Sequence, residues 1–226
     1  MKKRMKILKD IGLIYKNYWK NNFFWYTCIT KSGDTMKKKI MIDMDDVITH
    51  GGFLHLINEF LGTNYKIEDF NDFYMQDMLP DKDAFFSWFI TQNQYDYCEM
   101  LPGAKEVIEE LNKYYDVYIG TSYVFRDIPH ESSVILKQKC DYLKKELPFI
   151  TPFQYIFLYD KSLLNIDIKI DDKPDNLTNC ERKILFNAWH NNISEEELNE
   201  LGIEKVNNWY EIKDKLITDE IINDLK

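Results

Sequence analysis

The stretch KKKIMIDMDDVITH, residues 37–50, sets three carboxylates directly behind a short apolar run. They are Asp43, Asp45 and Asp46, and the apolar run predicts a buried strand over 39–43. Carboxylates this close together repel one another unless a cation lies between them, and divalent metals such as Mg²⁺ take oxygen ligands. The stretch therefore predicts a metal-assisted site at the end of a strand.

Polar groups also end two other strand-like runs. YDVYIGTS ends in Thr121 and Ser122, and IDIKIDD ends in Asp171 and Asp172. In an open parallel sheet, ligands bind beyond the carboxyl ends of the strands, so these groups are expected at one rim. Carboxylates, hydroxyls and a lysine at such a rim are typical of phosphoryl transfer. One carboxylate attacks phosphorus, another handles the proton, and metal and lysine neutralise the phosphate oxygens.

Strands and helices alternate along most of the chain, as the positioning of these groups requires. Helices are predicted between most of the strands, one after Pro102-Gly103, one from Ser132 to Pro148, and one from Ser194 to Gly202. The strand-like runs lie at 39–43, 115–122, 155–160, 166–172 and 183–188. This alternation predicts an α/β fold with a doubly wound, mostly parallel, Rossmann-like sheet.

One region breaks the alternation. Residues 50–100 have helical spacing and many aromatic residues, and no strand is predicted in them. We interpret this region as a small helical cap inserted after the first strand. The catalytic core is then expected to comprise residues 36–49 and 101–226, and residues 1–35 to form an extension outside the fold.

Charge divides the 226-residue chain unevenly. Residues 1–39 hold 11 basic and 2 acidic residues, a balance of +9, and the remainder holds 18 basic and 36 acidic residues, a balance of -18. A net charge of -9 argues against binding of a nucleic-acid polymer, which needs a basic surface. With 45% hydrophobic residues, the chain can bury a large core.

The first 35 residues are basic and aromatic, but their apolar runs are too short for a spanning helix, and no stable membrane insertion is expected. They can be interpreted as a helix lying on a membrane surface, or as sequence upstream of a start at Met36. The four widely spaced cysteines form no CxxC pair, which favours reduced thiols in the cytoplasm.

Several motifs together resemble the haloacid dehalogenase superfamily of phosphatases, and within it the 5'(3')-deoxyribonucleotidase family and its bacterial relatives. DMDDV resembles the nucleophile motif DxDx(T/V) of that superfamily. The other matching segments are LPGA at 101–104, TS at 121–122, DKS at 160–162, IDDKPD at 170–175 and LFNAWHN at 185–191. The resemblance spans about residues 38–213, and six motifs in the family's order carry far more weight than one.

The resemblance implies roles for the acidic residues. Asp43 would be the nucleophile that forms an aspartyl-phosphate, and Asp45 would protonate the leaving group and then activate water. The cofactor would be Mg²⁺, held by the Asp43 carboxylate, the backbone carbonyl of Asp45 and Asp172, with Asp171 adjacent.

The resemblance also assigns the groups around the substrate. Thr121 and Ser122 would bind phosphate oxygens. Lys161 matches the family's phosphate-binding lysine, and Lys139 is an alternative that could reach the same rim. Two aromatic residues of the cap region, Trp88 and Phe89, are the candidates for stacking on a base, although such rings more often belong to a core. Family members are often dimers, which makes a homodimer an expectation.

Three positions depart from the family pattern. Asp46 replaces a glycine, Tyr159 stands in place of an arginine, and Gly51 in place of a phenylalanine that lines the base pocket. These departures leave nucleotide specificity open. His190, in the segment AWHNN, is interpreted as a structural polar residue.

Several functions stay open on the sequence alone. The first is a phosphomonoesterase acting on nucleoside monophosphates, and the second is a phosphatase acting on a sugar phosphate or another small phosphate ester. A phospho-acceptor receiver domain is disfavoured because its acidic pair precedes the acceptor strand, whereas here the DxD segment comes first. A silent phosphate-binding module is disfavoured because it would not need Asp43, Asp45, Thr121, Lys161 and Asp172 together.

Overall fold

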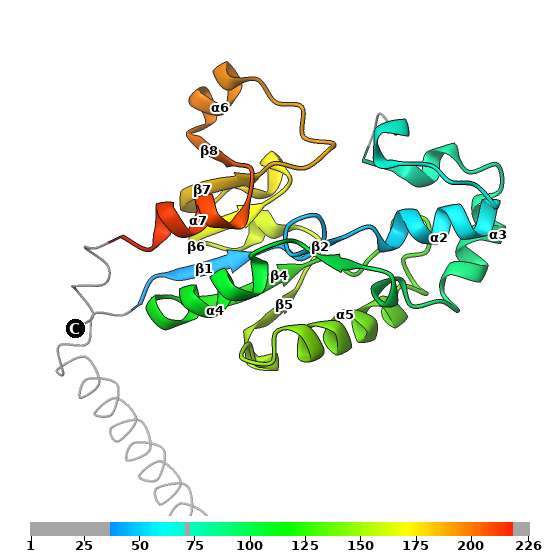
Figure 1. Ribbon diagram of the computed structural model, residues 1–226, viewed down its shortest axis with the longest axis horizontal. Helices are drawn as coiled ribbons and strands as arrows, with labels where there is room; N and C mark the ends of the chain where they lie inside the picture. The colour runs from blue at the N-terminus through cyan, green and yellow to red at the C-terminus, as the bar shows by residue number, and fades with distance from the viewer. Residues whose placement is uncertain (1–36, 71–72, 219–226) are drawn as a thin grey trace, which may run out of the picture. The chain divides into compact units, whose positions relative to one another are not determined.

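The computed structural model describes residues 37–70 and 73–218 of the chain (Figure 1). The extension predicted over 1–35 lies outside these residues. The strands are β1 (Lys39–Ile42), β2 (Thr49–His50), β3 (Glu99–Met100), β4 (Asp116–Thr121), β5 (Tyr155–Phe157), β6 (Ile166–Asp171), β7 (Cys180–Phe186) and β8 (Ile203–Val206). The helices are α2 (Gly52–Leu61), α3 (Lys82–Phe89), α4 (Ala104–Tyr114), α5 (Ser133–Glu146), α6 (Glu195–Leu201) and α7 (Trp209–Leu216).

Six of the strands form one sheet, in the order β5-β4-β1-β6-β7-β8, and every neighbouring pair is parallel. This arrangement confirms the predicted doubly wound α/β fold. Strand β1 lies inside the sheet, and Ile40, Met41 and Ile42 on it are buried on both faces, as expected of a strand covered by helices on each side. The edge strand β8 was not predicted, because its four residues mix charged and apolar side chains.

Gly120 in β4 is required by a close approach to the neighbouring strand. A Cβ atom at this position would lie 2.3 Å from the sulfur of Met41 on β1. The residue after Gly120 is Thr121, one of the predicted phosphate ligands, so the tight contact fixes the end of β4 beside the end of β1.

The helices begin and end where the sequence signals them. Ser194 and Glu197 form a capping box at the start of α6, and Gly202 ends that helix with φ 63. Helix α4 buries Val107, Ile108 and Leu111 as predicted. None of the helices in the described part of the chain is long and apolar enough to cross a membrane.

The segment between β2 and β3 carries α2, α3 and short 3-10 helices, which matches the predicted helical character of residues 50–100. The prediction that this region contains no strand was wrong, because β3 pairs antiparallel with β2. A ribbon of two residues per strand is too short to give an alternating pattern. The division into core and cap remains a prediction.

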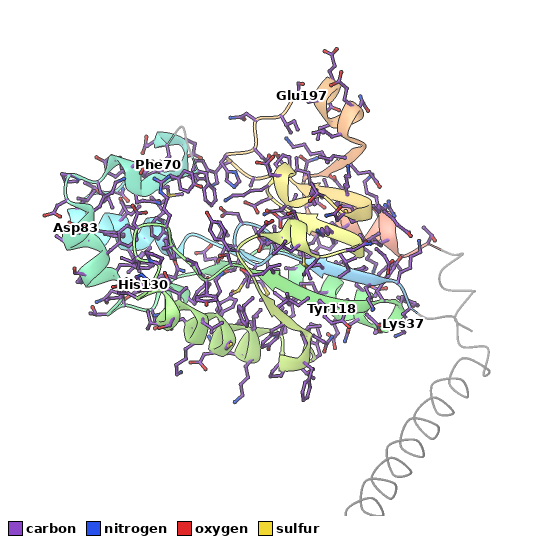
Figure 2. The ribbon with its side chains drawn as sticks, turned by 180° about the vertical axis from the view of Figure 1, so that it is seen from behind. Lys37, Phe70, Asp83, Tyr118, His130 and Glu197 are labelled. Atoms are coloured by element: carbon purple, nitrogen blue, oxygen red, sulfur yellow. The ribbon has the colours of Figure 1, made fainter. Side chains whose placement is uncertain are left out.

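The helical segment lies beyond the carboxyl ends of the sheet strands. Figure 1 shows α2 and α3 at the end of the molecule toward which the β1 arrow points. Figure 2 places Phe70 and Asp83 of this segment far from Lys37, which precedes β1. Buried rings of the segment, including Phe85, Phe86 and Phe89, belong to the same apolar core as the sheet residues, so the segment is packed onto the sheet end.

Candidate active site

The predicted acidic and hydroxyl groups meet at one rim of the sheet. Asp43 directly follows β1, and its backbone N–H donates to the carbonyl of Ile170 at 2.9 Å. Strand β1 lies between β4, which ends at Thr121, and β6, which ends at Asp171. The structure thus brings together the ends of three adjacent strands, as the rule for parallel sheets predicts.

The first half of the site consists of Lys161, Asp43 and Asp171, with the lysine between the two carboxylates. Its ammonium is 2.8 Å from Asp43 Oδ1 and 2.5 Å from Asp171 Oδ2. The lysine follows β5 in a short 3-10 helix, and its side chain is 3% exposed. A buried ammonium needs compensating negative charge, and these two carboxylates supply it.

The electrostatics of this half keep Asp43 charged. Burial raises the pKa of the Asp43 carboxyl, but the ammonium groups of Lys161 and Lys139 outweigh burial and hold the pKa below its ordinary value. Burial lowers the pKa of Lys161, but the Asp43 and Asp171 carboxylates more than reverse this and raise it. A carboxylate that stays ionised when buried is available as a nucleophile.

The second half of the site contains Lys139, from α5. Its ammonium pairs with Asp45 Oδ2 and donates to Thr121 Oγ1 at 2.7 Å. The hydroxyl of Tyr95 donates to Asp45 Oδ1 at 2.8 Å. The two lysines considered as alternatives from sequence therefore both lie at the rim, one beside Asp43 and one beside Asp45.

The carboxylates of Asp43, Asp171 and Asp172 form a group that could hold a cation. One oxygen from each lies within 4.8 Å of the others. Asp172 Oδ1 is buried and has no hydrogen-bond partner among the described residues. Burial and the charges of Asp171 and Asp43 raise the pKa of Asp172 well above its ordinary value. A divalent cation would relieve both the repulsion and the orphaned oxygen, so the donor set fits a hard metal such as Mg²⁺.

Neighbouring groups orient these carboxylates. Both oxygens of Asp171 have partners, since Oδ2 contacts Lys161 and Oδ1 accepts from Asn176 Nδ2 at 2.8 Å. Asp172 Oδ2 lies 2.7 Å from His190 Nε2, which leaves Oδ1 for a cation. This difference favours Asp172 as the ligand and Asp171 as its neighbour. His190, interpreted from sequence as structural, thus contacts a predicted metal ligand.

The departure at Asp46 has a backbone explanation. Asp46 has φ 57, in the left-handed region that glycine adopts most readily and that aspartate tolerates better than most residues. Its N–H donates to the carbonyl of Thr49 at 2.7 Å and closes the turn after the DxD segment. Burial and the charge of Asp45 raise the pKa of Asp46 to about 7.

The remaining predicted residues lie around this centre. Ser122 is half-buried, and its hydroxyl accepts from the Val124 N–H at 3.2 Å. Phe89 is 1% exposed within the apolar core, and Trp88 is half-buried with its ring 5.6 Å from that of Phe60. Stacking of either ring on a base stays a prediction.

A cavity of about 400 Å³, a volume within the range of small-molecule sites, opens beside His190, the residue that contacts Asp172. It is lined by Phe73, Tyr74, Lys173, Pro174, Asp175, His190, Asn191, Asn192 and Ile193. Phe73 and Tyr74 come from the helical segment, and the other residues come from the loops that follow β6 and β7. The cavity therefore lies between the helical segment and these loops.

Sequence reasoning did not identify Tyr95. This residue lies in the polar run TQNQYDYCEM, where nothing in its spacing separates it from the tyrosine two positions later. In the structure it is 5% exposed and contacts Asp45, 50 positions earlier in the chain.

The chain is similar to known proteins over most of its length. The model of the family described as 5' nucleotidase, deoxy (pyrimidine), cytosolic type C protein matches residues 37–221. A 5'(3')-deoxyribonucleotidase of Bacillus subtilis strain 168 is 31% identical over 197 residues, which cover 80% of this chain and 100% of the relative. A Staphylococcus epidermidis protein named provisionally for the same activity is 30% identical over 181 residues, covering 78% of this chain and 94% of the relative.

A solved structure shares the fold. The crystal structure of a predicted phosphatase from Clostridium acetobutylicum aligns with a TM-score of 0.54 and 17% identity, covering 81% of this chain and 99% of that one. At this identity the likeness concerns the fold alone.

Proposed function

We propose that this chain hydrolyses (deoxy)nucleoside monophosphates by way of an aspartyl-phosphate on Asp43. The chain belongs to the family described as 5' nucleotidase, deoxy (pyrimidine), cytosolic type C. Family membership makes the chain a phosphoric monoester hydrolase. The observation that carries the mechanism is the state of Asp43, a carboxylate only 12% exposed that two lysines keep ionised at the end of β1.

The proposed reaction has two steps, and both use Asp43 and Asp45. A carboxylate oxygen of Asp43 attacks phosphorus, the bond from phosphorus to the ester oxygen breaks, and Asp45 gives its proton to that oxygen. Asp45 then removes a proton from a water molecule that attacks the phosphorus of the aspartyl-phosphate. Inorganic phosphate leaves, Asp43 is restored as a carboxylate, and Asp45 is protonated again.

Phosphate binding is proposed for the groups between the two carboxylates. Thr121 and Ser122 can donate hydroxyl protons to phosphate oxygens, and the ammonium of Lys139 can turn from Asp45 to the arriving dianion. Lys161 lies beside Asp43 and would attract the same charge. Positive groups aimed at the equatorial oxygens lower the energy of phosphoryl transfer.

The proposed cofactor is Mg²⁺, held by the Asp43 carboxylate, the backbone carbonyl of Asp45 and Asp172, with Asp171 adjacent. When bound, Mg²⁺ supplies positive charge that neutralises the carboxylates and the phosphate. The buried, unpartnered Asp172 Oδ1 supports this assignment.

The substrate class is proposed from the relatives, whose names specify 5'(3')-deoxyribonucleotides. The 400 Å³ cavity supports a ligand of that size. Trp88 and Phe89 remain the proposed stacking candidates, and Tyr159, 67% exposed, takes the position of the family's arginine. We place the enzyme in the cytoplasm, acting on a small phosphate ester and not on a nucleic-acid polymer, with a homodimer as the proposed assembly.

The test is release of inorganic phosphate by the full chain with Mg²⁺, over 5'- and 3'-nucleoside monophosphates, with and without the 2'-hydroxyl, and sugar phosphates. Asp43→Asn should abolish release. Asp116→Asn, the same chemical change at the exposed amino end of β4, should not alter it. Release that persists in Asp43→Asn would contradict the nucleophile, and release from sugar phosphates alone would contradict the substrate.

A further inference from the structure

The carboxylate of Asp45 is held by two groups, one on each oxygen. Lys139 pairs with Oδ2, and Tyr95 donates its hydroxyl to Oδ1 at 2.8 Å. The side chain of Asp45 is 51% exposed, whereas that of Lys139 is 2% exposed. The contact therefore joins a buried tyrosine of the helical segment to a carboxylate that is half exposed to solvent.

The hydroxyl of Tyr95 is a fixed donor. An ionised carboxylate can only accept hydrogen bonds, so the Tyr95 hydroxyl is the donor in its contact with Asp45 Oδ1. The ring packs on that of Tyr142 at 5.4 Å, and the residue lies in a 3-10 helix at Gln94–Asp96. A donor that packing holds in place defines one orientation of its partner.

The same helix positions both contacts of Asp45. Lys139 is on α5, and the preceding residue on α5, Gln138, donates through Nε2 to the carbonyl of Gln92 at 2.7 Å. This bond ties the loop that carries Tyr95 to α5. Helix α5 and the loop that carries Tyr95 therefore pack together, and this packing sets the distance between the Lys139 ammonium and the Tyr95 hydroxyl.

We propose that Tyr95 is a positioning residue that anchors Asp45 Oδ1, so that Oδ2 is the oxygen that exchanges protons in both steps of the reaction. This proposal rests on the proposed function of Asp45. Because Tyr95 always donates to Oδ1, a proton on the carboxyl is directed to Oδ2. As Lys139 moves to the phosphate, Oδ2 is freed. The freed Oδ2 takes up a proton from solvent, which reaches this half-exposed carboxyl. It gives that proton to the ester oxygen as the bond from phosphorus breaks, and it later takes a proton from the attacking water.

Tyr95→Phe tests the proposal, because it removes only the hydroxyl and keeps the ring. Tyr142→Phe is the matched control, since it removes a hydroxyl from the adjacent ring that donates to Thr49 Oγ1 and not to Asp45. The quantity measured is kcat/KM, which covers the steps up to formation of the aspartyl-phosphate. The two substrates are a 5'-deoxynucleoside monophosphate and 4-nitrophenyl phosphate, whose leaving group needs no proton.

Tyr95→Phe should lower kcat/KM for the nucleotide about 10-fold, through kcat and not KM, and leave the value for 4-nitrophenyl phosphate within about 2-fold. Tyr142→Phe should leave both values within about 2-fold. In an Asp45→Asn background, Tyr95→Phe should cause no further loss with the nucleotide, a result that does not depend on the aryl substrate.

Equal losses on the two substrates, additive losses with Asp45→Asn, or an unchanged nucleotide rate would each overturn the positioning role. An increase in KM alone would do so too, because the ring would then act in binding. Asp43→Asn, measured alongside, distinguishes failure of this proposal from failure of the proposed function. If Asp43→Asn remains active, the proposed mechanism is wrong. If Asp43→Asn is inactive, the Tyr95→Phe result decides the positioning role by itself.

Discussion

The two halves of the site use the same residue type in different surroundings. Lys161 and Lys139 have side chains only 3% and 2% exposed, so burial does not distinguish them. Their partners do. The carboxylates beside Lys161 are 12% exposed at Asp43 and 1% at Asp171, whereas Asp45, beside Lys139, is 51% exposed.

This difference in exposure suits the two halves to different chemical roles. Around Lys161 every charged partner is enclosed, and charge there is compensated by fixed neighbours. Around Lys139 the carboxylate can be reached by water or a ligand, so its partners can be exchanged. The enclosed half suits a nucleophile that must stay ionised in one place, and the open half suits a group that passes protons to and from bound molecules.

The largest expected effect is that of Lys161→Met. The change leaves Asp43 and Asp171 as uncompensated buried carboxylates, which should lower the free energy of unfolding by about 3–5 kcal/mol. Activity should fall at least about 100-fold, because positive charge beside the proposed nucleophile is lost. Chemical denaturation and phosphate release measure the two quantities. A variant as stable as the parent would show that the two halves are not energetically different.

Lys139→Met should affect activity far more than stability. Asp45 can be hydrated once its partner is gone, so the expected loss of unfolding free energy is about 1 kcal/mol. The rate should still fall about 100-fold, because the predicted phosphate-binding ammonium is removed. The control is Lys144→Met, an exposed lysine on the same helix. A stability loss equal to that of Lys161→Met would remove the contrast between the halves.

Mg²⁺ should stabilise the enclosed half, by about 2.7 kcal/mol when its concentration is 100 times Kd. A carboxyl whose pKa rises on folding adds stability below its unfolded value of about 3.9 and loses that contribution as the pH rises through the folded value. For Asp46 that folded value is about 7, and the pKa of Asp172 is raised as well. Without metal, the free energy of unfolding therefore falls at higher pH. A cation binds ionised carboxylates best at that same pH.

The increase in Tm on adding Mg²⁺ should accordingly be larger at pH 8 than at pH 6. Taking the difference with and without metal at each pH removes the contribution of the other carboxyl groups. Asp172→Asn should abolish most of the increase, and Asp116→Asn should retain it. An equal increase in the two variants would place the cation elsewhere.

The smallest expected effect is that of Asp46→Gly, on the border between the two halves. Glycine adopts φ 57 without strain and removes a half-buried carboxyl, so the unfolding free energy should rise by up to about 1 kcal/mol. The rate of phosphate release should change less than about 3-fold. A collapse of activity would show that Asp46 takes part in the chemistry.

The sequence alone determined which groups gather at the rim. Apolar runs ending in Asp43, Thr121 and Asp171 predict parallel strands, and the carboxyl ends of parallel strands share one edge. The fold class, the family and the segments that carry the site followed from local patterns and their order along the chain. Elements with little local pattern, such as the two-residue strands β2 and β3 and the edge strand β8, did not.

Only the tertiary structure decided which groups touch. Lys139 and Asp45 are 94 positions apart and Tyr95 and Asp45 are 50 apart, so no spacing rule connects them. The packing of two elements, each carrying one lysine, brings both Lys161 and Lys139 to the rim, and which of them binds phosphate stays a prediction. Periodicity determines the direction of a side chain from its own element, but contacts between elements depend on how the whole core packs.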